Sequence, residues 1–139
     1  MLHIEHLNLV VNDIQETLTF YQAAFPHWTV RAKGNSTWHG ESQDWLHFGD
    51  DYQFLTFNDA GIKGKNDLSV HQVGISHFAF VTNNVADIKR RLIEAGFTVK
   101  AEGPKHPHRA NVYFFDPNGL EVEFVQYFSD LPEQRNSGA

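Results

Sequence analysis

The sequence predicts an α+β fold built from two βαβββ modules, because a unit of about seventy residues is written twice. Residues 3–11 and 75–81 are apolar, strand-like runs that each carry a histidine near the start. A polar break and a helix-like segment follow each run, and each half closes with a further strand-like run, at 52–57 and at 120–127. We therefore expect one domain spanning residues 1–139.

The first module, residues 1–60, reads as a strand, a helix and three strands. Side chains alternate along the first strand, so that His6 and Asn8 share one face. Asp13 is a suitable N-cap for the helix that follows, and Glu16 stands three residues on, as in a capping box. The remaining segments are a strand at 28–32, a turn at 33–36, a loop at 37–43, a strand at 44–48, a turn at 49–51 and a strand at 52–57.

The second module, residues 74–128, repeats this order after a charged, glycine-containing linker at 59–73. Asn84 and Asp87 mark the start of its helix, and Gly96 stands where a C′ residue is expected. Its other segments are strands at 75–81, 97–101, 111–115 and 120–127, a polar loop at 102–109, a hairpin turn at 116–119, and beyond the module a loose or partner-wrapping tail at 129–139.

Composition excludes several classes of function. The chain has 139 residues, a formal net charge of −6 and no cysteine, so disulfides, thiolate metal sites and cysteine nucleophiles are excluded. The acidic balance argues against nucleic acid and acidic membrane surfaces as partners. No apolar run reaches the roughly 18 residues of a membrane span, and the N-terminus lacks the basic and apolar regions of a signal peptide. We expect a cytoplasmic protein.

Two histidines and one glutamate form the candidate site. His6 and His77 lie at equivalent points of the repeat, and Glu123 lies on the last strand of the second module. Such side chains are rarely buried without partners, so we expect the two half-sheets to be cupped around a cavity that these residues face. Two imidazoles and one carboxylate can ligate a divalent metal and leave positions open for a substrate. A simpler interpretation makes each histidine a strand-edge side chain and Glu123 half of a solvated stripe with Glu121.

Four stretches carry a resemblance to a known family: residues 4–11, 19–21, 77–81 and 115–123. They resemble the vicinal oxygen chelate superfamily, which includes glyoxalase I, extradiol dioxygenases, fosfomycin thiol transferases, methylmalonyl-CoA epimerases and bleomycin-binding proteins. The metal ligands of that superfamily lie on the first and last strands of each module. The resemblance therefore implies His6, His77 and Glu123 as metal ligands here.

The fourth ligand position of the resemblance falls on Phe54, which cannot bind a metal. Glyoxalase I and the epimerases resemble one another in using Glu or Gln there, so this departure counts against a standard glyoxalase I. The remaining His-His-Glu set is similar to that of the extradiol dioxygenases and fosfomycin transferases. We expect Phe54, Asn8, Asn111 and Tyr113 to contact the substrate. Tyr113 stands where the fosfomycin branch keeps a tyrosine near the metal, and it joins Glu123 as a candidate catalytic residue.

The acid–base residue remains open at this point. The dioxygenases often carry an additional histidine for this purpose, and His47, His106 or His108 could play that part. Their spacing does not choose between them. The polar loop at 102–109 holds two of these histidines and could lie over the pocket.

Two classes of function fit the sequence. The first is a metal-dependent enzyme of lyase, isomerase or dioxygenase type, in which one divalent ion per site (Fe, Mn, Zn, Ni or Co) binds oxygens of a small substrate. The second is a metal-free or metal-assisted binding protein of the bleomycin- or fosfomycin-resistance type. The ligand set favours the enzyme, because such binders usually lack the histidines and the glutamate. The resemblance also implies a homodimer whose sites are shared between chains.

Overall fold

The computed structural model describes residues 1–67 and 72–138. Residues 68–71 of the expected linker, and Ala139 at the end of the expected tail, lie outside the described residues. The chain divides into two compact units, one for each predicted module, and each unit has its own sheet and helix. No helix in the described part of the chain is long and apolar enough to cross a membrane.

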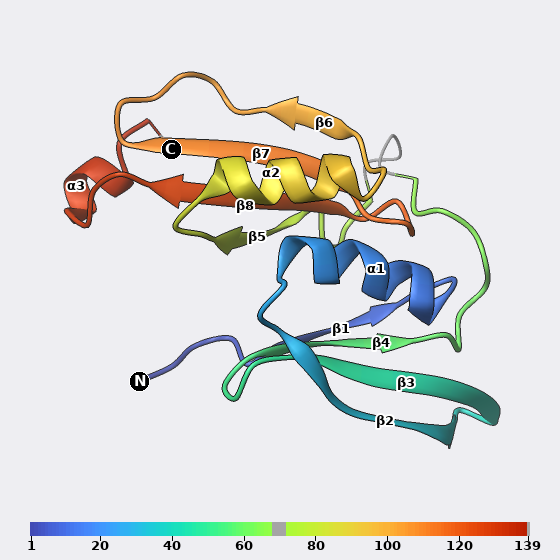
Figure 1. The fold of residues 1–139 in the computed structure, drawn as a ribbon. Coiled ribbons are helices and arrows are strands. Elements are labelled where there is room, and N and C mark those ends of the chain that lie inside the picture. Colours follow the sequence, from blue (N-terminus) through green and yellow to red (C-terminus); the bar gives the residue numbers. More distant parts are fainter. Residues whose placement is uncertain (68–71, 139) are drawn as a thin grey trace. The chain divides into compact units, whose positions relative to one another are not determined.

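The first unit, Met1–Asn66, is a βαβββ module with one four-stranded sheet (Figure 1). Its elements are β1 (His6–Val10), α1 (Ile14–Ala24), β2 (Thr29–Trp38), β3 (Glu41–Gly49) and β4 (Phe54–Asn58). The strands lie in the order β1-β4-β3-β2. The sheet is mixed, because β1 runs parallel to β4 and the other neighbours are antiparallel.

The helix of the first unit covers one face of this sheet. The Asp13 carboxylate accepts a hydrogen bond from the Glu16 N–H at 2.8 Å, which confirms Asp13 as the N-cap. Tyr21 is fully buried, and its ring centroid lies 5.4 Å from that of Phe57 on β4. The alternate side chains of each strand stand on the other face of the sheet, away from this core.

The prediction of a turn and a loop over residues 33–43 is wrong. Strands β2 and β3 continue through them and form a long hairpin that turns at His39 and Gly40, whose φ angles are 51° and 81°. The Trp45 ring lies over Gly34, where a Cβ atom would stand 2.8 Å from the ring. Glycine therefore suits this strand position, because it leaves room for the side chain of its cross-strand partner.

The second unit, Asp67–Ala139, repeats the βαβββ order (Figure 1). Its elements are β5 (Phe78–Val81), α2 (Val85–Glu94), β6 (Val99–Glu102), β7 (Arg109–Phe115), β8 (Glu121–Tyr127) and the short α3 (Pro132–Arg135). The strands lie in the order β5-β8-β7-β6, with β5 parallel to β8 and the other neighbours antiparallel. The order of strands and their relative directions are therefore the same in both units.

The predicted boundaries of the second helix are confirmed. The Asn84 side chain accepts a hydrogen bond from the Asp87 N–H at 3.1 Å, and Gly96 adopts a φ of 96° just after the helix. The first strand is shorter than predicted, because it begins at Phe78 rather than at residue 75. His77 therefore precedes the strand that it was expected to lie on.

The C-terminal segment is bound to its own unit, so the prediction of a loose tail is wrong. The Arg109 guanidinium donates hydrogen bonds to the carbonyl oxygens of Ser137 at 2.9 Å and Gly138 at 3.0 Å. The guanidinium of Arg135, in α3, lies 4.0 Å from the ring centroid of Tyr127. One planar guanidinium can bind several carbonyl groups at once, which attaches the end of the chain to the start of β7.

The turn that leads into β8 should depend on the buried Asp116 carboxylate. Its Oδ1 accepts hydrogen bonds from the N–H groups of Asn118 at 2.8 Å and Leu120 at 3.0 Å. Asp116→Ala should lower the free energy of unfolding by about 2 kcal/mol, because two N–H groups lose their acceptor. Urea denaturation measures this loss. Asp116→Asn keeps a carbonyl acceptor and should lose less, and equal losses in the two variants would contradict this role.

Candidate functional site

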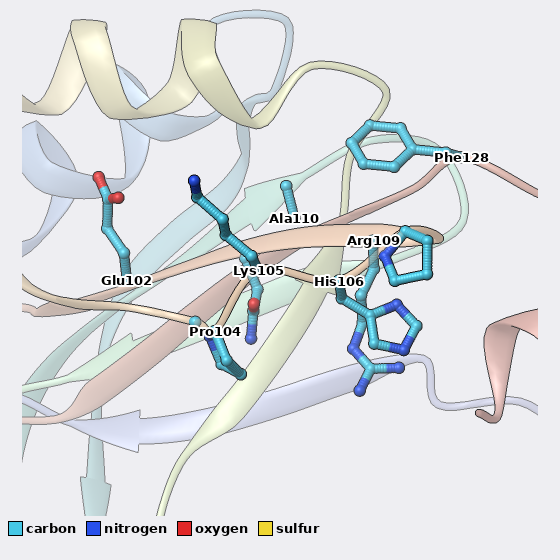
Figure 2. Close-up of a pocket in the computed structure, with 10 residues that line it drawn as sticks. Glu102, Pro104, Lys105, His106, Arg109, Ala110 and Phe128 are labelled. Atoms are coloured by element: carbon cyan, nitrogen blue, oxygen red, sulfur yellow. The ribbon is translucent and has the colours of Figure 1, made fainter. Parts of the chain in front are cut away.

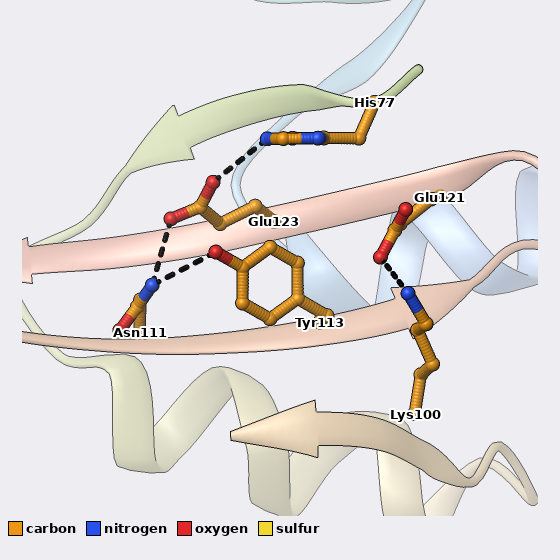
Figure 3. A network of polar contacts seen from close by, with 6 residues as sticks. All are labelled: His77, Lys100, Asn111, Tyr113, Glu121 and Glu123. Carbon is orange, nitrogen blue, oxygen red and sulfur yellow. Dashed lines mark hydrogen bonds and ion pairs between the residues drawn. The ribbon is translucent and has the colours of Figure 1, made fainter. Parts of the chain in front are cut away.

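Four predicted site residues of the second unit lie together, and we call them the Glu123 cluster: His77, Asn111, Tyr113 and Glu123 (Figure 3). Asn111 and Tyr113 share one face of β7, and Glu123 faces them from β8, where it pairs with Tyr113 in register. His77 immediately precedes β5, and its side chain reaches the cluster from there. Pairing of β8 with a strand on each side therefore brings together residues that are far apart in the sequence.

Hydrogen bonds fix the two oxygens of the Glu123 carboxylate differently. The Asn111 amide donates to Oε1 at 3.0 Å and to the Tyr113 hydroxyl at 3.1 Å. Oε2 lies 3.2 Å from Nε2 of His77. The Glu123 side chain is only 14% exposed, whereas His77 is 39% exposed. One oxygen is therefore held by an amide, and the other faces an imidazole.

The phenol of Tyr113 stays neutral in this setting. Burial raises the pKa of Tyr113 above its ordinary value of 10.0, and the charge of Glu123 raises this pKa further. The hydroxyl accepts a hydrogen bond from Asn111, and its own proton is directed at the Glu123 carboxylate, which also raises the pKa of Tyr113. Tyr113 can thus serve as a hydrogen-bond donor beside the carboxylate.

Glu121 differs from Glu123 although both stand on the same face of β8. Glu121 forms an ion pair with Lys100 (Figure 3). The Lys100 ammonium also lies 5.4 Å from the ring centroid of Phe115. Glu123 has polar and imidazole partners instead. The simpler interpretation of two equivalent, solvated glutamates therefore does not describe this face.

The donor atoms of His77 and Glu123 suit two ligands of one metal ion. Ligands at about 2.1 Å from the same ion and at right angles to each other lie about 3.0 Å apart, close to the observed 3.2 Å. A neutral imidazole and a carboxylate are also a usual ligand pair for divalent transition metals. Within residues 1–67 and 72–138, no group of three His, Asp or Glu side chains is close enough to hold a metal.

Three predicted residues of the first unit lie together with one that was not predicted, Arg31, and we call this group the Phe54 cluster: His6, Arg31, His47 and Phe54. The His6 ring stacks on Phe54, with centroids 4.7 Å apart and planes inclined by 14°. The His47 ring centroid also lies 4.7 Å from that of Phe54, and the Arg31 guanidinium carbon lies 4.3 Å from it. Phe54 therefore organises an aromatic and cationic face.

Asn8 is held by a neighbour on the same sheet. Its Oδ1 accepts a hydrogen bond from the Asn58 amide at 2.8 Å. Its side chain is thus paired with a side chain of the neighbouring strand β4, and its contact with a substrate stays a prediction.

Arg31 was not predicted from the sequence. It lies on β2 and contacts Phe54 across the sheet, and it belongs to no sequence motif.

The three histidines proposed as acid–base residues have different surroundings in the structure. His47 lies in the Phe54 cluster, beside the candidate ligand His6. His106 lies near the C-terminal segment, 3.3 Å from the Ser137 hydroxyl, and His108 stacks edge-on against His106. Burial lowers the pKa of His47 below its ordinary value of 6.5, and the charges of Arg31 and then His6 lower this pKa further.

The two modules differ in strand pairing. Phe54 pairs with His6 itself, whereas Glu123 pairs with the residue two beyond His77. By pairing, the first-module counterpart of Glu123 is therefore Thr56, which pairs with the residue two beyond His6. Neither Phe54 nor Thr56 is a carboxylate, so neither position supplies the first module with a counterpart of the Glu123 carboxylate.

A cleft of about 490 Å³ lies beside the start of β7 (Figure 2). It is lined by Lys105 and His106 of the polar loop before β7, by Arg109 at the start of β7, and by Phe128. Asn111 belongs both to this cleft and to the Glu123 cluster. The other three residues of the Glu123 cluster do not line this cleft.

Comparison with known proteins gives one family. The family model described as Glyoxalase/Bleomycin resistance protein/Dioxygenase superfamily matches residues 3–124. No curated protein sequence matches the chain significantly. Many solved structures do match it, and the following three cover most of both chains.

A glyoxylase/bleomycin resistance protein/dioxygenase domain from Frankia sp. EAN1pec is 16% identical, with a TM-score of 0.74, over 97% of this chain and 98% of that one. A variant of the fosfomycin resistance protein FosX from Listeria monocytogenes, complexed with Mn(II) and 1S,2S-dihydroxypropylphosphonic acid, is 19% identical, with a TM-score of 0.68, over 97% and 98%. Lactoylglutathione lyase from Agrobacterium tumefaciens is 21% identical, with a TM-score of 0.61, over 89% and 92%. These TM-scores show a shared fold, and at such low sequence identities the likeness extends to the fold alone.

The His47 imidazole should titrate below pH 6.5. The unfolded chain then binds more protons than the folded chain as the pH falls below about 6.5, so stability is lost in that direction. A histidine-resolved NMR titration measures the pKa directly. Arg31→Gln should raise the pKa of His47 without restoring it to 6.5, because the burial remains. A wild-type value at or above 6.5 would refute this assignment.

Proposed function

Because the chain belongs to the Glyoxalase/Bleomycin resistance protein/Dioxygenase superfamily, we propose that it is a divalent-metal-dependent enzyme acting on a small molecule whose oxygen atoms chelate the metal. The observation that carries this proposal is the paired His77 and Glu123, whose facing donor atoms fit one metal ion. His6, at the equivalent point of the first module, is the proposed third ligand. One metal ion per site is expected, with Fe, Mn, Zn, Ni and Co all compatible with these ligands.

The proposed roles follow from the surroundings of each residue. A bound divalent metal would stabilise negative charge that develops on a substrate oxygen. Glu123 is the anionic ligand, and the neutral Tyr113 hydroxyl beside it can donate a hydrogen bond to the substrate. Phe54 is proposed as an aromatic wall, and neither Phe54 nor Thr56 would add a fourth ligand, which leaves metal positions for substrate oxygens. Lyase, isomerase and dioxygenase reactions all fit this arrangement.

A second candidate function is small-molecule binding without chemistry, as in a resistance protein. The Phe54 cluster favours it, because an aromatic face with a nearby guanidinium suits a planar or anionic ligand. Metal removal separates the two functions. A chelated protein that keeps its affinity for small molecules is a binder, and one that loses an activity together with its metal is an enzyme.

Replacing Glu123 should abolish metal retention. Glu123→Ala should weaken metal affinity by more than about 100-fold, beyond the 10–100-fold typical of residues that only support a ligand. Elemental analysis of protein purified without a histidine tag measures the retained metal. Glu121→Ala is the matched control, because this carboxylate shares the strand face but is paired with Lys100. If Glu123→Ala keeps its metal, or Glu121→Ala loses it equally, the ligand assignment is wrong.

We further propose that the protein is a homodimer in which His6 of one chain completes the site of its partner. The edge strands β1 and β5 support this, because each ends one sheet and carries an exposed valine, Val10 or Val81. An edge strand with unpaired backbone groups and apolar side chains is a template for pairing with another strand. A two-fold assembly would pair such edges in two equivalent places.

Mixing two defective chains tests the shared site. In a dimer of His6→Ala with Glu123→Ala, one site carries both lesions and the other is intact. After random exchange about a quarter of all sites should regain metal, whereas neither variant alone retains any. Sedimentation as a monomer at micromolar concentration, or no recovery from chains shown to exchange, would exclude the shared arrangement.

A further inference from the structure

We propose that Gly103 and Asn111 are positioning residues that fix the Glu123 carboxylate, so that Oε1 is held by the protein and Oε2 is left for a metal. This proposal rests on the proposed function, because it concerns the carboxylate proposed as a ligand. Gly103 lies between β6 and β7, at the start of the polar loop, and Asn111 lies on β7. Neither residue is a proposed metal ligand.

Gly103 leaves space that the Asn111 side chain occupies. A Cβ atom at residue 103 would stand 2.8 Å from Nδ2 of Asn111 and still closer to its Cγ and Oδ1. The backbone of Gly103 is not in the left-handed region, so its conformation does not require glycine. The Gly103 N–H also donates to the Asn111 carbonyl oxygen at 3.0 Å, which holds the two backbones together. Glycine is needed here for room.

The contacts of Asn111 determine which way its amide points. Nδ2 lies 3.0 Å from Oε1 of Glu123 and 3.1 Å from the Tyr113 hydroxyl, and both oxygens can accept (Figure 3). The opposite orientation would place the amide oxygen against the carboxylate, which is unfavourable. The amide oxygen therefore faces Gly103, and the amide protons face the carboxylate.

This orientation gives the two oxygens of the Glu123 carboxylate different partners. Oε1 accepts from Asn111, and Oε2 remains beside Nε2 of His77 at 3.2 Å. A carboxylate held in this way presents one oxygen to a metal in a fixed direction. Residues that orient a metal ligand typically contribute 10–100-fold to metal affinity without touching the ion.

Gly103 has an alternative role that must be separated from this one. A side chain at residue 103 could instead distort the polar loop and weaken the unit in general. The two explanations differ in how substitutions combine. If Gly103 acts only by giving Asn111 room, then its substitution has no further effect once the Asn111 side chain is gone.

The test is a double-mutant cycle on the full chain, with Co(II) affinity measured by calorimetry. Gly103→Ala and Asn111→Ala should each weaken Co(II) binding by about 10–100-fold. The double variant should bind as weakly as Asn111→Ala alone, and no weaker. Asn35→Ala is the matched control, because this asparagine lies on β2 and donates to Asp44, and it should leave the affinity unchanged. Additive losses in the double variant, or wild-type affinity in Asn111→Ala, would overturn the proposal.

A second readout uses the metal-free chain and so separates this proposal from the proposed function. The Asn111 amide protons should exchange slowly by NMR in the wild type, because both have acceptors, and rapidly in Gly103→Ala and Glu123→Ala. Fast exchange in the wild type would overturn the positioning role. If exchange is slow but the wild-type chain binds no Co(II), then Asn111 does hold the Glu123 carboxylate, and the proposal that Glu123 is a metal ligand is rejected.

Discussion

Burial of one face of each sheet under its helix is the constraint on which the rest of the structure depends. A single helix covers each four-stranded sheet, so every second side chain of a strand joins the core and its neighbours stand on the other face. In β8, Val122 and Phe124 are fully buried, while Glu121 and Glu123 alternate with them. A slip of one residue would exchange these sets, so the same burial that stabilises the unit fixes where the candidate ligand points.

The faces of the two sheets that lie opposite the helices have different chemistry. In the first unit Phe54 is surrounded by two imidazoles and a guanidinium, which makes that face aromatic and cationic. In the second unit Glu123 is surrounded by an imidazole, an amide and a phenol, which makes that face anionic and rich in hydrogen-bond donors. The two modules thus share the same strand order and differ in the side chains on these faces.

Local rules account for what could be predicted about the fold. The caps at Asp13 and Asn84 are formed with N–H groups three residues away, so the sequence alone contains both partners. Alternation likewise needs only neighbouring residues, and it assigned the two faces of β1 and β8. The hairpin over residues 33–43 and the bound tail were missed, because Trp45 over Gly34 and Arg109 on the tail carbonyls join residues far apart in the chain.

The same distinction applies to the candidate site. The sequence by itself determined the repeat, the two modules and the candidates His6, His77 and Glu123, because these depend on periodicity and on a family pattern. Only the tertiary structure decided that Asn111 holds one oxygen of Glu123, that His47 stands beside Phe54, and that Glu121 is paired away with Lys100. Such partnerships depend on strand register and side-chain direction across a sheet, and neither quantity is contained in the spacing of residues along one chain.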